Sequence, residues 1–335
     1  MFSTPITRAF GLTTPIVNAG MAMVARPELA AAVSNAGALG TIGCDISAPV
    51  ELKALIGQVR ERTARPFGVD LIGDFLTDGH IDVLIEERIP VAIFFWTLPA
   101  RSQIQRLRHH GVAVWIQVGS VHEADAAVAL GIDALIVQGS EAGGHNRSEA
   151  STMAFFPHLR RRYPELPMLA AGGIVDGATM AGALALGADA VWCGSRFLAS
   201  REAAAHDDYK ARVIASEVGD TAMTTAYGPE WPDQPIRVIV TRGLREWGAG
   251  SAAGDEAMGT TLMGGERLPL PRFSAILPTR DFEGDIEYAC LTAGQSIGNI
   301  DAIRPAAEIV QAMTDEAIDV ISRLADRISS RKAAA

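Results

Sequence analysis

A glycine-rich segment that ends in a histidine holds the residues best suited to chemistry. Residues 132–138 form a short apolar, β-branched run, and Gly139-Ser140-Glu141-Ala142-Gly143-Gly144-His145 follows it. This pattern predicts a buried strand that ends in a loop, because glycine lets the backbone come close to a bound group. An imidazole titrates near neutral pH and can take a proton from a substrate. His145 is therefore a candidate general base; the alternative is a histidine in an ordinary surface loop.

Two other glycine-containing turns could hold an anion. Gly172-Gly173 follows the apolar run 168–171, and Gly194-Ser195 follows the run 188–193. Their amide N–H groups and the Ser195 hydroxyl are hydrogen-bond donors, although glycine is also common in such turns for structural reasons. Both turns together favour a phosphate-bearing cofactor. Glu141 has the wrong charge to help a phosphate, so we expect it to be structural or solvent-facing.

Eight strand–helix steps are expected to position these loops. Eight steps are typical of a closed (β/α)8 TIM barrel, whose loops after strands seven and eight often bind a phosphate. A doubly wound sheet usually has fewer strands, and no GxGxxG or Walker A motif is present to support a dinucleotide or P-loop domain. The predicted strands are residues 15–19, 38–42, 66–72, 90–96, 112–118, 132–138, 168–171 and 188–193. The predicted helices are residues 27–35, 48–63, 78–87, 100–110, 122–130, 151–163, 176–186 and 305–328.

The alternation of strands and helices lapses between residues 214 and 271. This stretch includes a weakly patterned, Gly/Ala-rich part from 248 to 265, which is typical of loops. We interpret residues 214–271 as a small inserted domain and residues 1–213 and 272–335 as the barrel. A lid over the barrel mouth is the expected role of the insertion; the alternative is a spacer that does not contact ligand.

Composition narrows the classes of partner. The net charge is -10, with three lysines in 335 residues, so the chain lacks the basic surface that binds nucleic acid. Cys44, Cys193 and Cys290 are odd in number and far apart, which favours reduced thiols and no metal site. No signal sequence or run of eighteen apolar residues is found. We therefore expect a cytoplasmic protein that acts on a small molecule, without membrane or nucleic-acid partners.

These motifs resemble the nitronate monooxygenase (2-nitropropane dioxygenase) family of FMN-dependent TIM barrels. The resemblance rests on residues 137–145, 170–174 and 194–197 and extends over nearly the whole chain. It implies that His145 is the catalytic base and that the phosphate turns hold FMN. The FMN contacts that it implies are Ala19, Gly20, Met21, Ala22, Asp70, Gln117, Gln138, Gly143, Gly144, Ala171, Gly172, Gly173, Gly194, Ser195 and Gln295.

Three positions depart from the family pattern. Gly20 replaces a proline, Asp70 stands where asparagine is common, and Trp96-Thr97 fills a position where a small glycine is common. An ionised Asp70 beside a flavin would oppose the negative charge of the reduced ring. Trp96 should reshape the pocket and with it the range of substrates.

The resemblance implies oxidation of nitroalkanes or nitronates with O₂. His145 would deprotonate neutral nitroalkanes, and FMN would accept the electrons. One alternative is an NADH-dependent FMN reductase of the same barrel family, similar to enoyl-acyl carrier protein reductases or NADH:quinone reductases. Another is a phosphate-ligand binding barrel without turnover. A homodimer is a candidate assembly.

Overall fold

A closed barrel of eight parallel strands forms the main body of the computed structural model, which describes residues 2–44, 46–248, 256–263 and 265–332. The strands follow the order β1-β9-β8-β6-β5-β4-β3-β2, and a parallel bridge from Val17 to Leu39 joins the two ends of this order. The predicted TIM barrel is therefore confirmed. The strands are β1 Ile16–Asn18, β2 Gly40–Gly43, β3 Phe67–Ile72, β4 Val91–Phe95, β5 Ala113–Val118, β6 Ala134–Gln138, β8 Met168–Ala171 and β9 Ala190–Cys193.

Apolar side chains on both faces of the strands explain why the barrel strands lack polar alternation. One buried cluster fills the barrel interior and includes Val17, Trp115, Ile136 and Trp192. A second, larger cluster lies between the strands and the surrounding helices. The short helix α1 (Pro5–Phe10), which sequence patterns did not predict, adds Ile6 to the interior cluster.

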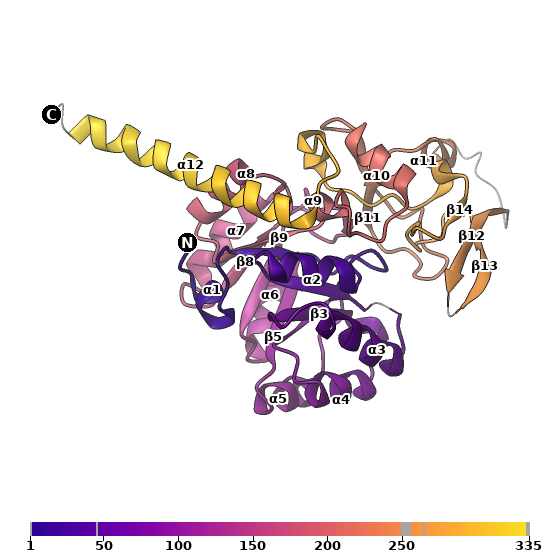
Figure 1. Ribbon diagram of the computed structural model, residues 1–335, viewed down its shortest axis with the longest axis horizontal. Coiled ribbons are helices and arrows are strands. Elements are labelled where there is room, and N and C mark those ends of the chain that lie inside the picture. The colour runs from indigo at the N-terminus through magenta and orange to yellow at the C-terminus, as the bar shows by residue number, and fades with distance from the viewer. Residues whose placement is uncertain (1, 45, 249–255, 264, 333–335) are drawn as a thin grey trace.

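Helices surround the barrel (Figure 1). Each predicted helix is present, with ends displaced by a few residues. The helices are α2 Pro27–Asn35, α3 Pro49–Arg60, α4 Asp78–Glu86, α5 Arg101–His109, α6 Val121–Ala129, α7 Thr152–Arg162, α8 Gly177–Ala185 and α12 Ala306–Lys332. Helix α12 runs along α8, and its C-terminal end extends beyond the barrel (Figure 1). None of the described helices is long and apolar enough to cross a membrane.

Two small antiparallel sheets lie outside the barrel. The first has the order β10-β11-β7 and takes β7 (Gly144–His145) from the loop after β6. The second has the order β13-β12-β14, so β14 (Glu283–Gly284) continues this sheet past the expected end of the insertion at residue 271. In the Gly/Ala-rich part, residues 256–263 are described and include strand β12, whereas 249–255 and 264 lie outside the described residues. The other elements are η1 Gly73–Phe75, α9 Ser195–Leu198, α10 Asp207–Ile214, β10 Thr221–Thr224, β11 Ile236–Ile239, α11 Arg242–Gly248, β12 Ala257–Met263, β13 Glu266–Pro271, η2 Ile286–Tyr288 and η3 Gln295–Asn299.

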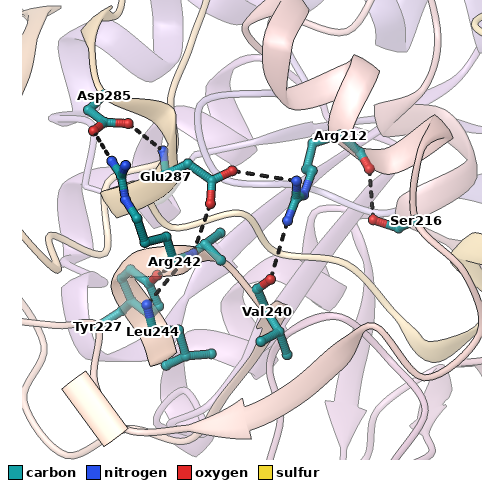
Figure 2. A network of polar contacts seen from close by, with 9 residues as sticks. Arg212, Ser216, Tyr227, Val240, Arg242, Leu244, Asp285 and Glu287 are labelled. Carbon is teal, nitrogen blue, oxygen red and sulfur yellow. Dashed lines mark hydrogen bonds and ion pairs between the residues drawn. The ribbon is translucent and has the colours of Figure 1, made fainter. Parts of the chain in front are cut away.

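A polar network links the helical parts of this region (Figure 2). The Glu287 carboxylate accepts the backbone N–H of Arg242 at 2.8 Å and lies 3.5 Å from the Arg212 guanidinium. The Arg242 guanidinium donates to Asp285 at 2.5 Å. These groups are partly exposed, so each pair contributes little alone. Together they connect α10, α11 and η2, immediately before the chain returns to the barrel.

Candidate active site

A cavity of about 280 Å³ opens where the barrel strands end. This is the end at which TIM barrels carry their active sites. Every predicted site residue except Gln295 lines this cavity. These residues are Ala19, Gly20, Met21, Ala22, Asp70, Gln117, Gln138, Gly143, Gly144, His145, Ala171, Gly172, Gly173, Gly194 and Ser195.

Gln295, which the resemblance also implies, is not among the residues that line this cavity. It is the first residue of η3, and its side chain is exposed, whereas Gly294 and Ser296 on either side line the cavity.

Four amide groups at the ends of β8 and β9 form a candidate phosphate site. Gly172 and Gly173 have φ angles of 100° and 77°, in the left-handed region that favours glycine. Among the hydrogen bonds of the described residues, none is donated by the backbone N–H of Gly172, Gly173, Gly194 or Ser195. The Ser195 hydroxyl accepts from the Gly294 N–H at 2.9 Å, which leaves its own hydrogen able to donate. This donor set fits an anionic phosphate.

The loop that carries His145 is held on several sides. The buried Asn146 side-chain amide donates to the carbonyl groups of Gly139 at 3.0 Å and Ala142 at 3.2 Å. The Arg237 guanidinium of β11 donates to the Ser140 carbonyl at 3.0 Å. The Glu141 carboxylate accepts the N–H of Thr152 at 2.9 Å, so Glu141 has the structural role that we expected. The loop is thus fixed by both the barrel and the insertion.

His145 is positioned in β7 with its ring in an aromatic environment. It pairs with Ile236 of β11, and its ring centroid lies 4.4 Å from that of Trp231 and 5.6 Å from that of Trp96. Its Nε2 atom is buried and has no hydrogen-bond partner among the described residues. Burial lowers the pKa of His145 to about 4. The imidazole is therefore neutral at pH 7 and able to accept a proton.

Gln138 supplies a second unpartnered polar atom to the cavity. Its side-chain amide donates to the His145 carbonyl at 3.2 Å, whereas its Oε1 atom is buried and accepts no hydrogen bond from the described residues. A buried acceptor is costly without a donor. Gln138 therefore fits a ligand that presents an N–H or O–H group.

Gly20 and Asp70, two of the three positions that depart from the family pattern, lie next to each other. A Cβ atom placed on Gly20 would lie 2.2 Å from the Asp70 Cβ and 2.5 Å from its Oδ2. Asp70 therefore occupies the space that any side chain at position 20 would need. Trp96, the third departure, has a φ angle of 79° and packs on His145, beside the cavity residues.

The inserted segment contributes lining residues that sequence patterns did not identify. Glu230, Trp231 and Ile236 all line the cavity, as do residues 275–277. Trp231-Pro232 is visible in the sequence, but nothing in its spacing places it beside His145. Within the described residues, no group of three or more His, Cys, Asp or Glu side chains could hold a metal ion.

Comparisons with known proteins place this site in a family. The chain is 30% identical to a (3aS,4S,5R,7aS)-5-hydroxy-7a-methyl-1-oxo-octahydro-1H-indene-4-carboxyl-CoA dehydrogenase of Mycobacterium tuberculosis, over 94% of this chain and 96% of that protein. It is 28% identical to a probable nitronate monooxygenase of Staphylococcus aureus, over 84% of this chain and 95% of that protein.

Solved structures of two enzymes are similar to this chain over nearly its whole length. FabK from Thermotoga maritima is similar with a TM-score of 0.82 and 32% identity, over 98% of this chain and all of that chain. A nitroalkane oxidase from Streptomyces ansochromogenes has a TM-score of 0.79 and 27% identity, over 95% of this chain and 99% of that one. The sequence model of the family named Nitronate monooxygenase matches residues 3–77 and 73–316. The chain therefore belongs to the nitronate monooxygenase family of oxidoreductases.

Proposed function

We propose that this protein is an FMN-dependent oxidoreductase that oxidises nitroalkanes and nitronates with O₂, with His145 as the general base. The observation that carries the proposal is the presence of two complementary groups in one cavity. One is a neutral imidazole whose buried Nε2 has no partner within the described ranges, and the other is the set of amides at Gly172, Gly173, Gly194 and Ser195, which donate to no group there. The first suits proton transfer and the second suits a phosphate.

These residues would hold FMN in a defined orientation. The four amides and the Ser195 hydroxyl would bind its phosphate. Gln138 Oε1 would accept a hydrogen bond from an N–H group of the flavin. Met21, which also lines the cavity, would border the flavin ring. When bound, FMN supplies the two-electron oxidant that the protein itself lacks.

The protein's own task is to remove a proton and exclude water. His145 Nε2 would accept the α-proton of a neutral nitroalkane, and a nitronate would need no such step because it has already lost that proton. Trp231, Ile236 and Leu277 line the cavity with apolar surface. We propose that the inserted segment, which supplies Trp231 and Ile236, acts as a lid.

The test is anaerobic flavin reduction by paired donors. Purified protein should be yellow and release FMN on denaturation. His145→Ala should slow reduction by a neutral nitroalkane by about a hundredfold to ten-thousandfold, the usual effect of losing a general base, and should spare the preformed nitronate. His158→Ala, on helix α7, is the matched control. Colourless protein that does not bind FMN, or equal activity of His145→Ala on the neutral donor, would refute the proposal.

A second candidate donor is an acyl-CoA ketone or alcohol. Two relatives named as the indene-carboxyl-CoA dehydrogenase support it: the one from Mycobacterium tuberculosis at 30% identity and one from Rhodococcus jostii at 36% identity over 222 residues. Removing a proton next to a carbonyl group needs the same neutral base. Anaerobic bleaching by a cyclic acyl-CoA, with no response to either nitro form, would favour this donor. Rapid reduction by NADH alone would favour the reductase alternative.

A further inference from the structure

The His145 ring is held by aromatic groups without a polar partner. Among the described residues, no side chain or backbone group forms a hydrogen bond with either ring nitrogen, and Nε2 is buried. Histidines that move protons are commonly oriented by a hydrogen bond from the second ring nitrogen to a carboxylate or carbonyl. Here the ring contacts are Trp231, at 4.4 Å between centroids, and Trp96, at 5.6 Å.

Both indoles are themselves fixed by hydrogen bonds to other elements. Trp231 Nε1 donates to the Asp74 carboxylate of η1 at 3.0 Å, and Trp96 Nε1 donates to the Gln234 side chain at 3.0 Å. The two indole centroids lie 4.9 Å apart, so Trp96, Trp231 and His145 form one three-ring cluster. The barrel loop that contains Asp74 therefore positions a ring of the insertion against the histidine.

We propose that Trp231 is a positioning residue for His145, and that together with Trp96 it replaces the carboxylate that usually orients a proton-accepting histidine. This inference rests on the proposed role of His145 as a base. The indoles exclude water from the neutral imidazole. The cluster thus keeps the resting base neutral and holds its ring in one orientation.

The charged groups around the cluster are compatible with this role. The Arg147 guanidinium lies 3.9 Å from the Trp96 ring centroid and pairs with Glu123 at 3.3 Å. The Asp74 carboxylate accepts a hydrogen bond from the indole N–H of Trp231. The Glu230 carboxylate accepts one from the Ala275 N–H at 2.9 Å. On β11, the Arg237 guanidinium is directed to the Ser140 carbonyl. No carboxylate among these groups forms a hydrogen bond or ion pair with the His145 ring.

The experiment titrates His145 directly and measures its chemistry in parallel. The imidazole pKa is followed by NMR in the FMN-loaded wild type, Trp231→Ala and Trp231→Phe, with the exposed Trp247→Ala of α11 as the matched control. In Trp231→Ala we expect the pKa of His145 to rise from about 4 toward the ordinary value of about 6.5, because water regains access to the imidazole. Trp231→Phe should keep most of the wild-type value, and Trp247→Ala should keep all of it.

The pH profile of flavin reduction supplies the second measurement. With a neutral donor, the wild-type rate should be nearly equal at pH 5.5 and pH 8. In Trp231→Ala the rate at pH 5.5 should fall about tenfold relative to pH 8, since a base with a pKa near 6.5 is then largely protonated. At pH 8, loss of the ring that orients the imidazole should cost about tenfold with the neutral donor and little with a preformed anion.

The outcomes separate this inference from the function on which it rests. Two results in Trp231→Ala would overturn the positioning role: an unchanged pKa of His145, and equal losses in the rate of flavin reduction with neutral and anionic donors. Trp231 would then only line the cavity. If His145→Ala itself does not slow the neutral donor, the proposed base fails. A raised pKa in Trp231→Ala would in that case still be seen by NMR, so the two failures are distinguishable.

Discussion

The Gly194→Ala substitution should weaken FMN binding without destabilising the fold. Gly194 has a φ angle of -94°, which any residue adopts, and a Cβ placed on it would lie 3.7 Å from the nearest atom, the Ala19 Cβ. The folded protein therefore accepts the methyl group in ordinary van der Waals contact, and the free energy of unfolding should change by less than about 0.5 kcal/mol. The same methyl group enters the cavity beside the proposed phosphate amides and should block close approach of the anion.

The expected loss in FMN affinity follows from the contacts removed. A hydrogen bond to a charged group contributes about 1.5–3 kcal/mol, so losing one should raise the Kd for FMN about tenfold to a hundredfold. The Kd is measured by quenching of FMN fluorescence, and stability by urea unfolding of the apoprotein. Gly143→Ala is the contrasting control, since its Cβ would lie 2.3 Å from the Ala293 carbonyl carbon and should destabilise the fold. Unchanged FMN affinity in Gly194→Ala would show that the phosphate binds elsewhere.

Three further predictions concern His145, the Gly20–Asp70 contact and the proposed lid. The folded pKa of His145, about 4, is below the unfolded value of about 6.5, so the unfolded chain takes up the proton first as pH falls. Wild type should therefore lose up to about 3 kcal/mol between pH 6.5 and pH 4, a loss absent in His145→Phe; identical pH slopes of the two unfolding free energies would contradict this. Gly20→Ala should lower the free energy of unfolding by about 1–3 kcal/mol, and Asp70→Gly in the same chain, which removes the clashing Cβ, should restore part of it; additive losses in a double-mutant cycle would argue against the contact. Arg237→Met leaves the Ser140 carbonyl without its donor and should speed FMN release while circular dichroism shows an intact barrel; an unchanged release rate would favour the spacer interpretation.

The barrel could be predicted because its signals are local. Each strand is a short apolar run, each βα turn is marked by small or turn-forming residues, and the rhythm repeats eight times. Residues at the strand ends, such as Gly172 and Gly194, then meet in one cavity because parallel strands end on the same side. Most of the candidate site follows from this geometry alone.

The insertion could not be predicted in the same way because its pairings are distant in sequence. Strand β7, of two residues, acquires its conformation from β11, some ninety residues later, through the pairing of His145 with Ile236. Strand β12 similarly pairs with β14 across the loop that supplies residues 275–277 to the cavity. No periodicity in such short strands reveals these partners. The aromatic neighbours of His145 therefore became visible only in the folded chain.

Asp70 and the aromatic neighbours of His145 both affect which electron donor the cavity accepts. Asp70 lines the cavity, and an ionised carboxylate there would disfavour an anionic donor such as a nitronate more than a neutral one. His145, neutral and surrounded by Trp96 and Trp231, is suited to removing a proton, a step that a nitronate does not need. Both features act in the same direction, toward neutral carbon acids that must be deprotonated in place. The neutral nitroalkane and the uncharged acyl group of an acyl-CoA therefore fit these residues better than the preformed nitronate does, although all three donors suit an oxidoreductase of this family.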